Sequence, residues 1–169
     1  MHSGSLKRTS LAAAALGATV AFVLPVSADA PISGPAQQYD NFGPNEVTIR
    51  DRKSGLRWTR PRSNEPYPVR KLADAKTYCA GLQPVGENRL PSLKELLSLV
   101  DEEPHAEYVD TRNQPRYIDR NAFLRTPDKA FWTSSEFPDG SATYTVDFRT
   151  GRVDKTSSIS EELGVFCVR

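Results

Sequence analysis

Cysteine and histidine are scarce in this chain of 169 residues, which contains two of each. Zinc sites need several such ligands at short spacing, whereas Cys79 and Cys167 stand far apart in the sequence. His105 is the one histidine beyond the N-terminal segment, so a Cys–His or Ser–His site would have to use it. Ser134 lies in no G-x-S-x-G elbow. We therefore expect a protein that is not an enzyme and has no metal site.

Calcium-binding patterns are absent as well. The acidic residues that follow position 100 do not match the D-x-D-x-D-G loop, which supplies closely spaced oxygen ligands. The triplets Glu-Pro-Asn and Gln-Pro-Asp, with which C-type lectins hold sugars through calcium, do not occur either. A solvated acidic loop explains these residues, and we expect no cofactor.

Long hydrophobic runs are missing after the N-terminus, where residues 11–26 form the single one. Two basic residues precede this run, and Val26-Ser27-Ala28 fits the small-x-small pattern of a cleavage site. A membrane anchor is the alternative, but the run is short and Pro25 interrupts it. We predict that residues 1–28 are a secretory signal peptide, although cleavage after Ala30 would also fit. The mature chain should be periplasmic, extracellular or at the cell surface, with no transmembrane anchor.

Charge of one sign is not in excess. The chain has 22 basic and 21 acidic residues, and removal of residues 1–28 leaves 20 and 21. A globally basic nucleic-acid-binding protein is therefore disfavoured, and we expect no nucleic-acid partner. Residues 29–45 are rich in Pro, Gly, Ser, Asn and Gln, which predicts a disordered lead, that is, a linker ahead of the domain. Residues 46–169 should form one domain.

The two cysteines could form a disulfide, bind a metal or supply a nucleophile. An even number of cysteines in an exported chain is typical of disulfide bonds. We predict a bridge between Cys79 and Cys167, which would close a loop over most of the domain.

The first half of the domain predicts a β-hairpin and a helix. Residues 47–49 and 56–58 alternate apolar and polar positions, and Gly55 lies in the turn between them. The inner face of this hairpin should carry Val47, Ile49, Leu56 and Trp58. Helical spacing then recurs at Leu72, Ala75, Cys79 and Leu82, which predicts a helix with Cys79 on its buried face.

A second helix is predicted within residues 89–101, the stretch around which the domain is organised. Leu93, Leu96, Leu97 and Val100 form its apolar stripe. Ser92 and Glu95 form the S-x-x-E capping box, which satisfies amide donors at a helix start. Arg89 should pair with Glu95 or with a neighbouring carboxylate.

The second half changes from helix to strand. Residues 102–128 show no sustained period and predict a long loop insert. Four strands follow, at residues 131–135, 142–148, 152–155 and 164–168. The expected fold is therefore α+β, with two helices packed on antiparallel strands, one long loop insert and one disulfide.

Six segments in register give this chain a specific resemblance. The sequence is similar to the Lcl C-terminal domain family over about residues 46–169. The segments are S-G-L-R-W at 54–58, A-K-T-Y-C at 75–79, R-L-P-S-L-K-E-L-L-S-L-V-D at 89–101, F-W-T-S-S at 131–135, V-D-F-R-T-G at 146–151 and F-C-V-R at 166–169.

The resemblance implies a C-type-lectin-like fold in an exported bacterial protein of the surface or envelope. It also implies adhesion through sulfated glycosaminoglycans, as in a collagen-like member of the family. The residues of these segments that we expect to be structural are Gly55, Trp58, Arg89, Leu90, Pro91, Ser92, Glu95, Trp132, Ser134 and Phe148.

Arginines supply the candidate ligands for an anion. Between residues 50 and 76 nine basic residues face three acidic ones, and guanidinium groups grip sulfate or carboxylate with two hydrogen bonds. A solvated outward face, paired with nearby acids, is the alternative explanation. The candidate anion-binding residues are Arg50, Arg52, Arg57, Arg60, Arg62, Arg112, Arg116 and Arg120.

The sequence thus predicts an exported, non-catalytic binding or adhesion module for an anionic glycan. A structural envelope subunit that binds another protein is the alternative, and an enzyme is a third hypothesis. The sequence leaves the oligomeric state and the identity of the ligand open.

Overall fold

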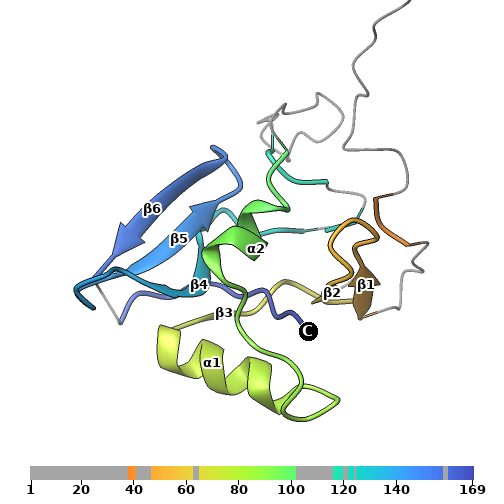
Figure 1. The fold of residues 1–169 in the computed structure, drawn as a ribbon, viewed down its shortest axis with the longest axis horizontal. Coiled ribbons are helices and arrows are strands. Elements are labelled where there is room, and N and C mark those ends of the chain that lie inside the picture. The colour runs from red at the N-terminus through yellow and green to blue at the C-terminus, as the bar shows by residue number, and fades with distance from the viewer. Residues whose placement is uncertain are drawn as a thin grey trace, which may run out of the picture.

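The computed structural model of this chain places its elements in two sheets with two helices (Figure 1). The predicted signal peptide lies outside the described part, as does most of the long insert. The residues that the structure describes are 38–40, 47–62, 65–101, 116–119, 122–123, 125–157 and 160–169.

A β-hairpin forms the start of the domain. Strand β1 (Thr48–Arg50) pairs antiparallel with β2 (Arg57–Thr59), so that Ile49 lies opposite Trp58. Both of these side chains are buried, as alternation in the sequence predicts. Gly55 adopts a φ of 78°, which ends the turn, because glycine takes positive φ without a steric penalty. Val47 was expected on the inner face but is 48% exposed, because it precedes the first paired residue of β1.

Segments from both ends of the chain extend this hairpin into a wider sheet. Tyr39 bridges to Asp51 in antiparallel fashion, so residues 38–40 pair with β1. On the other side, residues 167–169 pair with β2, and Val168 also bridges to Arg89. We call this assembly of 38–40, β1, β2, 167–169 and residue 89 the terminal sheet. Residues 38–40 therefore belong to the folded domain, although the sequence assigned them to the disordered lead.

The second sheet has five strands in the order β3-β7-β4-β5-β6. Most neighbours are antiparallel, but β4 and β7 pair parallel, so the sheet is mixed rather than purely antiparallel as expected. Gly164 lies opposite Phe131 at this junction, and a Cβ there would approach the Phe131 ring to 2.6 Å. The strands are β3 (Val69–Arg70), β4 (Phe131–Glu136), β5 (Thr143–Asp147), β6 (Arg152–Thr156) and β7 (Leu163–Gly164).

Helix α1 (Leu72–Gly81) is bonded covalently to the terminal sheet. Its apolar face carries Leu72, Ala75 and Cys79, all buried, as the helical spacing predicts. Cys79 and Cys167 form the predicted disulfide, with Cα atoms 5.4 Å apart. The bridge therefore joins α1 to the last strand of the terminal sheet.

Helix α2 (Leu93–Leu97) begins at the predicted capping box. The Ser92 hydroxyl accepts from the Glu95 amide, and the Glu95 carboxylate accepts from the Ser92 amide at 2.8 Å. Arg89 donates to both carboxylate oxygens of Glu95, at 2.8 and 2.7 Å. The helix has only five residues, shorter than the apolar stripe predicts, because Ser98 and Leu99 continue as a turn.

Strand β4 holds the start of α2 against the five-stranded sheet. Its pairing with β5 is irregular between Trp132 and Glu136, which leaves backbone groups available on the other side. The Ser134 amide donates to the Pro91 carbonyl at 2.7 Å, and the Leu93 amide donates to the Ser135 hydroxyl at 2.9 Å.

The core between the two sheets is aromatic. Phe166 stacks on Phe131 with ring centroids 4.6 Å apart, and it meets Phe148 and Trp58 edge to face. Such pairs add about 0.5–1.5 kcal/mol each beyond the area they bury. Because these rings come from both sheets, the core joins the terminal sheet to β4 and β5. No helix of the described residues is long and apolar enough to cross a membrane.

The contact between Arg89 and Glu95 makes stability depend on pH. The hydrogen bond from Arg89 lowers the pKa of Glu95 from 4.5 to about 2, so the folded state favours the ionised carboxylate. A depressed pKa stabilises the fold above pH 4.5, and this contribution is lost as pH falls toward 2. At neutral pH, Glu95→Gln should lower the free energy of unfolding by about 1 kcal/mol.

Chemical denaturation of Glu95→Gln and wild type at several pH values tests this expectation. The difference between the two proteins should shrink as pH falls from 4.5 toward 2. Glu136→Gln is the control, because its ion pair with Lys76, at 3.5 Å, is exposed. A difference that stays constant between pH 7 and pH 2 would contradict the assignment.

Candidate functional site

Three arginines lie in one line across the outer face of the terminal sheet. Arg50 lies opposite Arg57 in the hairpin. Arg57 and Arg169 exchange both backbone hydrogen bonds, at 2.8 and 3.0 Å, so they also lie directly opposite each other. Ile49, Trp58 and Val168, the neighbours of these arginines, point into the core. We call Arg50, Arg57 and Arg169 the arginine row.

An acidic residue stands at each end of the row. Asp40 pairs with β1 next to Arg50 and forms an ion pair with Arg52 at 2.5 Å. The hydrogen bond from Arg52 lowers the pKa of Asp40, and the charges of Arg50 and Arg57 lower it further. At the other end, Arg169 donates to Glu87 at 2.8 Å.

The two arginines in the middle of the row, Arg50 and Arg57, are exposed. Among the described residues, neither has a carboxylate within ion-pair distance. Like charges placed directly opposite each other on a sheet destabilise it. The pair is therefore a local electrostatic cost to the fold that no described carboxylate offsets at ion-pair distance.

The structure buries two of the predicted anion ligands, Arg60 and Arg116, which the sequence analysis expected at the surface. Arg60 is 7% exposed, and its guanidinium donates to the Ala122 carbonyl at 3.2 Å. Arg116 is 2% exposed and forms an ion pair with Asp128. Both guanidinium groups satisfy internal partners, so they do not face a large ligand in solution.

The remaining candidates divide between the surface and the part outside the described residues. Arg52 is exposed but occupied by Asp40, and Arg62 is exposed at 3.7 Å from Glu65. Arg112 and Arg120 lie outside the described residues, as does His105. The structure thus brings Arg50 and Arg57 together and adds Arg169, which the sequence analysis did not select.

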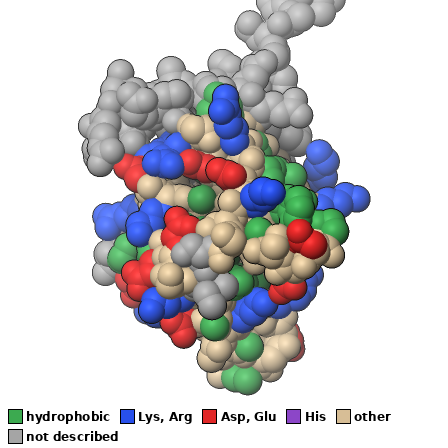
Figure 2. Space-filling model, turned by 90° about the vertical axis from the view of Figure 1, so that its left-hand side faces the viewer, with side chains coloured by type: hydrophobic (Ala, Val, Ile, Leu, Met, Phe, Trp, Pro, Cys, Tyr) green, Lys and Arg blue, Asp and Glu red, His purple; other side chains and the backbone are tan. Residues whose placement is uncertain are grey.

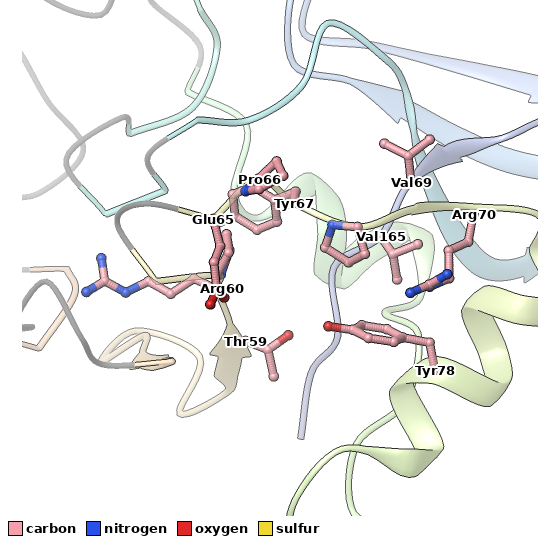
Figure 3. Close-up of a pocket in the computed structure, with 11 residues that line it drawn as sticks. Thr59, Arg60, Glu65, Pro66, Tyr67, Val69, Arg70, Tyr78 and Val165 are labelled. Carbon is pink, nitrogen blue, oxygen red and sulfur yellow. The ribbon is translucent and has the colours of Figure 1, made fainter.

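A pocket of about 390 Å³, drawn in Figure 3, lies next to β2, the strand that carries Arg57. Thr59 lines it from β2, on the same side of that strand as Arg57, because side chains two residues apart share a face. Thr59 is held by Cys167, since its hydroxyl donates to the Cys167 carbonyl at 3.1 Å. The lining residues are Thr59, Arg60, Pro61, Glu65, Pro66, Tyr67, Pro68, Val69, Arg70, Tyr78 and Val165.

Arg70 and Tyr78 are the polar groups on the α1 side of the pocket. The Arg70 guanidinium lies 5.0 Å from the centroid of the Tyr78 ring, a cation–π contact. Burial raises the pKa of the half-buried Tyr78. Trp132 donates from Nε1 to the Arg70 carbonyl at 2.8 Å, which fixes the strand that carries Arg70.

The residues that the sequence assigned to structure have mostly internal positions. Trp58, Leu90, Trp132 and Phe148 are buried. Ser134 is different, because its side chain is exposed and its amide alone makes the contact with Pro91.

Charges are arranged differently among the described residues of the side that carries β6. Figure 2 shows the side on which β6 lies, where acidic and basic side chains are interspersed. Arg152 at the start of β6 lies opposite Asp147 of β5, an acid rather than another base. Among the described residues, no group of three or more His, Cys, Asp or Glu is placed to hold a metal ion.

Sequence reasoning did not select Arg169 or Tyr78, and it counted Arg70 among the basic residues of 50–76 without choosing it as a candidate ligand. One signal was available for Arg169, because residues 166–169 alternate and put it on the same side as Cys167. Nothing in the sequence indicated that the segment containing Arg70 is a strand of two residues beside the start of α1.

Comparison with known proteins gives a family and no individual relative. No curated protein and no solved structure matches this chain. The profile of the Lcl C-terminal domain matches residues 47–169, which include strands β1 to β7, both helices and the disulfide. This chain therefore belongs to the Lcl C-terminal domain family.

Proposed function

We propose that this protein is an exported, non-catalytic binding module that attaches to an anionic polymer, such as a sulfated or acidic glycan. The arginine row is the observation that carries the proposal. The row places two exposed arginines directly opposite each other on neighbouring strands, with no carboxylate at ion-pair distance among the described residues. The cell surface or the envelope is the place where such a polymer would be met.

The spacing of the row favours a chain of anions over a single small ion. Neighbouring strands lie about 4.8 Å apart, so the Cα atoms of Arg50 and Arg169 are separated by about 10 Å. A sulfate ion can contact one or two such positions, whereas a polymer with repeated sulfate or carboxylate groups can contact Arg50 and Arg57 together and continue toward Arg169, which Glu87 holds at the end of the row. Arginine suits both groups because its planar fork forms two parallel hydrogen bonds.

The position of the row also supports binding to something large. The row lies at an outer face of the terminal sheet, at the end of the molecule opposite β6 (Figure 1). An extended ligand can therefore approach it without entering a cleft. The described residues around β6 instead show basic and acidic side chains interspersed (Figure 2).

Export and architecture are parts of the same proposal. A disulfide between buried cysteines is typical of oxidising compartments, and the N-terminal 28 residues have the pattern of a signal peptide. Membership of the family supports a C-type-lectin-like architecture, and here the C-terminal strand pairs with the first hairpin. A non-catalytic role is part of the same proposal, and it agrees with the bridge, because neither cysteine is free to act as a thiol nucleophile.

Binding of heparin, used as a sulfated probe polymer, tests the proposed function. Wild type should bind at low salt, and the affinity should fall steeply as salt is added, because bound arginines displace counterions. The double variant Arg50→Thr/Arg57→Thr should bind more weakly, with the slope of log Kd against log salt reduced by about one for each lost contact. Arg152→Thr, which removes an exposed arginine from β6, is the matched control and should bind as wild type does.

Two outcomes would remove the proposal. One is no detectable binding at low salt. The other is binding that ignores both salt and the arginine row, which would favour the alternative of a structural envelope subunit with an apolar protein interface.

Stability should change in the opposite direction to binding. Arg57→Thr removes a repulsion between like charges and places a good strand former in β2, so unfolding should become harder by about 0.2–1 kcal/mol at low salt. Added salt should shrink the gain by screening. Denaturant titration measures it, and a variant less stable than wild type at low salt would show that Arg57 supports the fold.

A further inference from the structure

The pocket next to β2 has the size and lining of a site for one sugar ring. Its volume of about 390 Å³ falls within the range of about 300–1,000 Å³ that is usual for small-molecule sites. Proline rings and the Tyr78 ring form much of the wall, as Figure 3 shows. Flat apolar faces of this kind pack against the C–H surface of a pyranose.

One cation in the pocket is ready for a carboxylate. In Figure 3 the Arg70 guanidinium points toward the middle of the pocket, above Tyr78. Among the described residues, no carboxylate lies within ion-pair distance of it. The contact with the Tyr78 ring, at 5.0 Å, holds the guanidinium plane in place. A guanidinium fixed in this way can form two hydrogen bonds to one carboxylate.

The other polar groups suit hydroxyl groups rather than a second anion. Glu65 is an exposed acceptor at the rim, and its weak contact with Arg62, at 3.7 Å, leaves oxygen lone pairs available. The Tyr78 hydroxyl points across the pocket toward Thr59 and can donate or accept (Figure 3). Arg60 does not compete, because its guanidinium turns away to Ala122.

The disulfide keeps these groups in position. Tyr78 directly precedes Cys79, and Thr59 is hydrogen bonded to Cys167 through its hydroxyl. Arg70 lies opposite Leu163 of β7, next to the same end of the chain. The pocket is therefore preformed by a covalent bond and by strand pairing, which limits the entropy lost when a ligand binds.

We propose that this pocket binds a uronic acid residue, that is, a hydroxylated six-membered ring carrying a carboxylate. Arg70 takes the carboxylate, and Glu65 and Tyr78 take ring hydroxyls. This inference deepens the proposed function by naming a sugar class for the anionic polymer. Thr59 and Arg57 share one side of β2, so a uronic acid in the pocket would belong to a chain that continues over the arginine row.

Titration of the oxidised protein with D-glucuronate, followed by two-dimensional NMR, tests the inference. Glucuronate should shift the signals of residues around Arg70 and Tyr78, whereas D-glucose should not. Arg70→Gln should weaken binding about tenfold or more, because a charge-assisted fork is lost. Arg70→Lys keeps the charge but loses the fork and should also weaken binding, and Arg152→Gln should leave it unchanged.

Several results would overturn the assignment. The first is that glucuronate shifts no NMR signals of the pocket residues. The second is that glucose and glucuronate bind equally well. The third is that Arg70→Gln, with an unchanged melting temperature, binds glucuronate as tightly as wild type does. N-acetylalanine has the carboxylate of a peptide C-terminus. If it binds more tightly than glucuronate, the pocket is a site for peptide C-termini instead.

A second variant separates this inference from the proposed function. Arg50→Thr/Arg57→Thr leaves the pocket intact and should bind free glucuronate as wild type does. If glucuronate binds at the pocket while heparin binding does not depend on Arg50 and Arg57, the proposed function is wrong and the assignment of the pocket is kept. If heparin binding depends on Arg50 and Arg57 while glucuronate does not bind, only the assignment of the pocket is wrong.

Discussion

The bond between Cys79 and Cys167 is the constraint on which the rest of this structure depends. It joins α1 to the last strand across a separation of 88 residues. The chain-entropy description assigns about 4–5 kcal/mol to closure of so long a loop, an upper figure because residual structure in the unfolded chain reduces it. The gain matters in a domain whose hairpin strands have only three residues each.

The bridge does more than stabilise, because the candidate site is assembled from segments that it holds together. The last residues of the chain pair with β2 on one side and with Arg89 on the other. Arg169 joins the arginine row only through this pairing. Thr59 is hydrogen bonded to Cys167, and Tyr78 directly precedes Cys79. The site therefore combines an early hairpin, the first helix and the C-terminus, which lie far apart in the sequence. A row of like charges that lowers stability is tolerable where a covalent bond secures the neighbouring strand.

Local patterns in the sequence predict much of this fold. Alternation finds the hairpin, helical spacing finds α1, and the S-x-x-E signature finds the start of α2. The disulfide follows from the number of cysteines in a chain with a signal-like N-terminus. The hairpin, α1 and the start of α2 each depend on residues that are close in the sequence. The disulfide depends on two cysteines that have no other cysteine to pair with.

The remaining features depend on contacts between distant segments, which sequence patterns do not report. The parallel pairing of β4 with β7 and the packing of residues 38–40 against β1 are of this kind. For the site, composition indicated that arginines gather in the first half, but it could not separate inward from outward ones. Arg60 is buried and donates to the Ala122 carbonyl, and Arg116 is buried and forms an ion pair with Asp128. Arg50 and Arg57, in contrast, are exposed to solvent.

Amide hydrogen exchange before and after reduction of the disulfide tests most directly whether the bridge holds the terminal strand in place. The account predicts that reduction lowers protection most at Arg57, Thr59, Val168 and Arg169, whose amides bond across this junction, and least in the middle of β5. Unchanged protection at those four amides after complete reduction would contradict it.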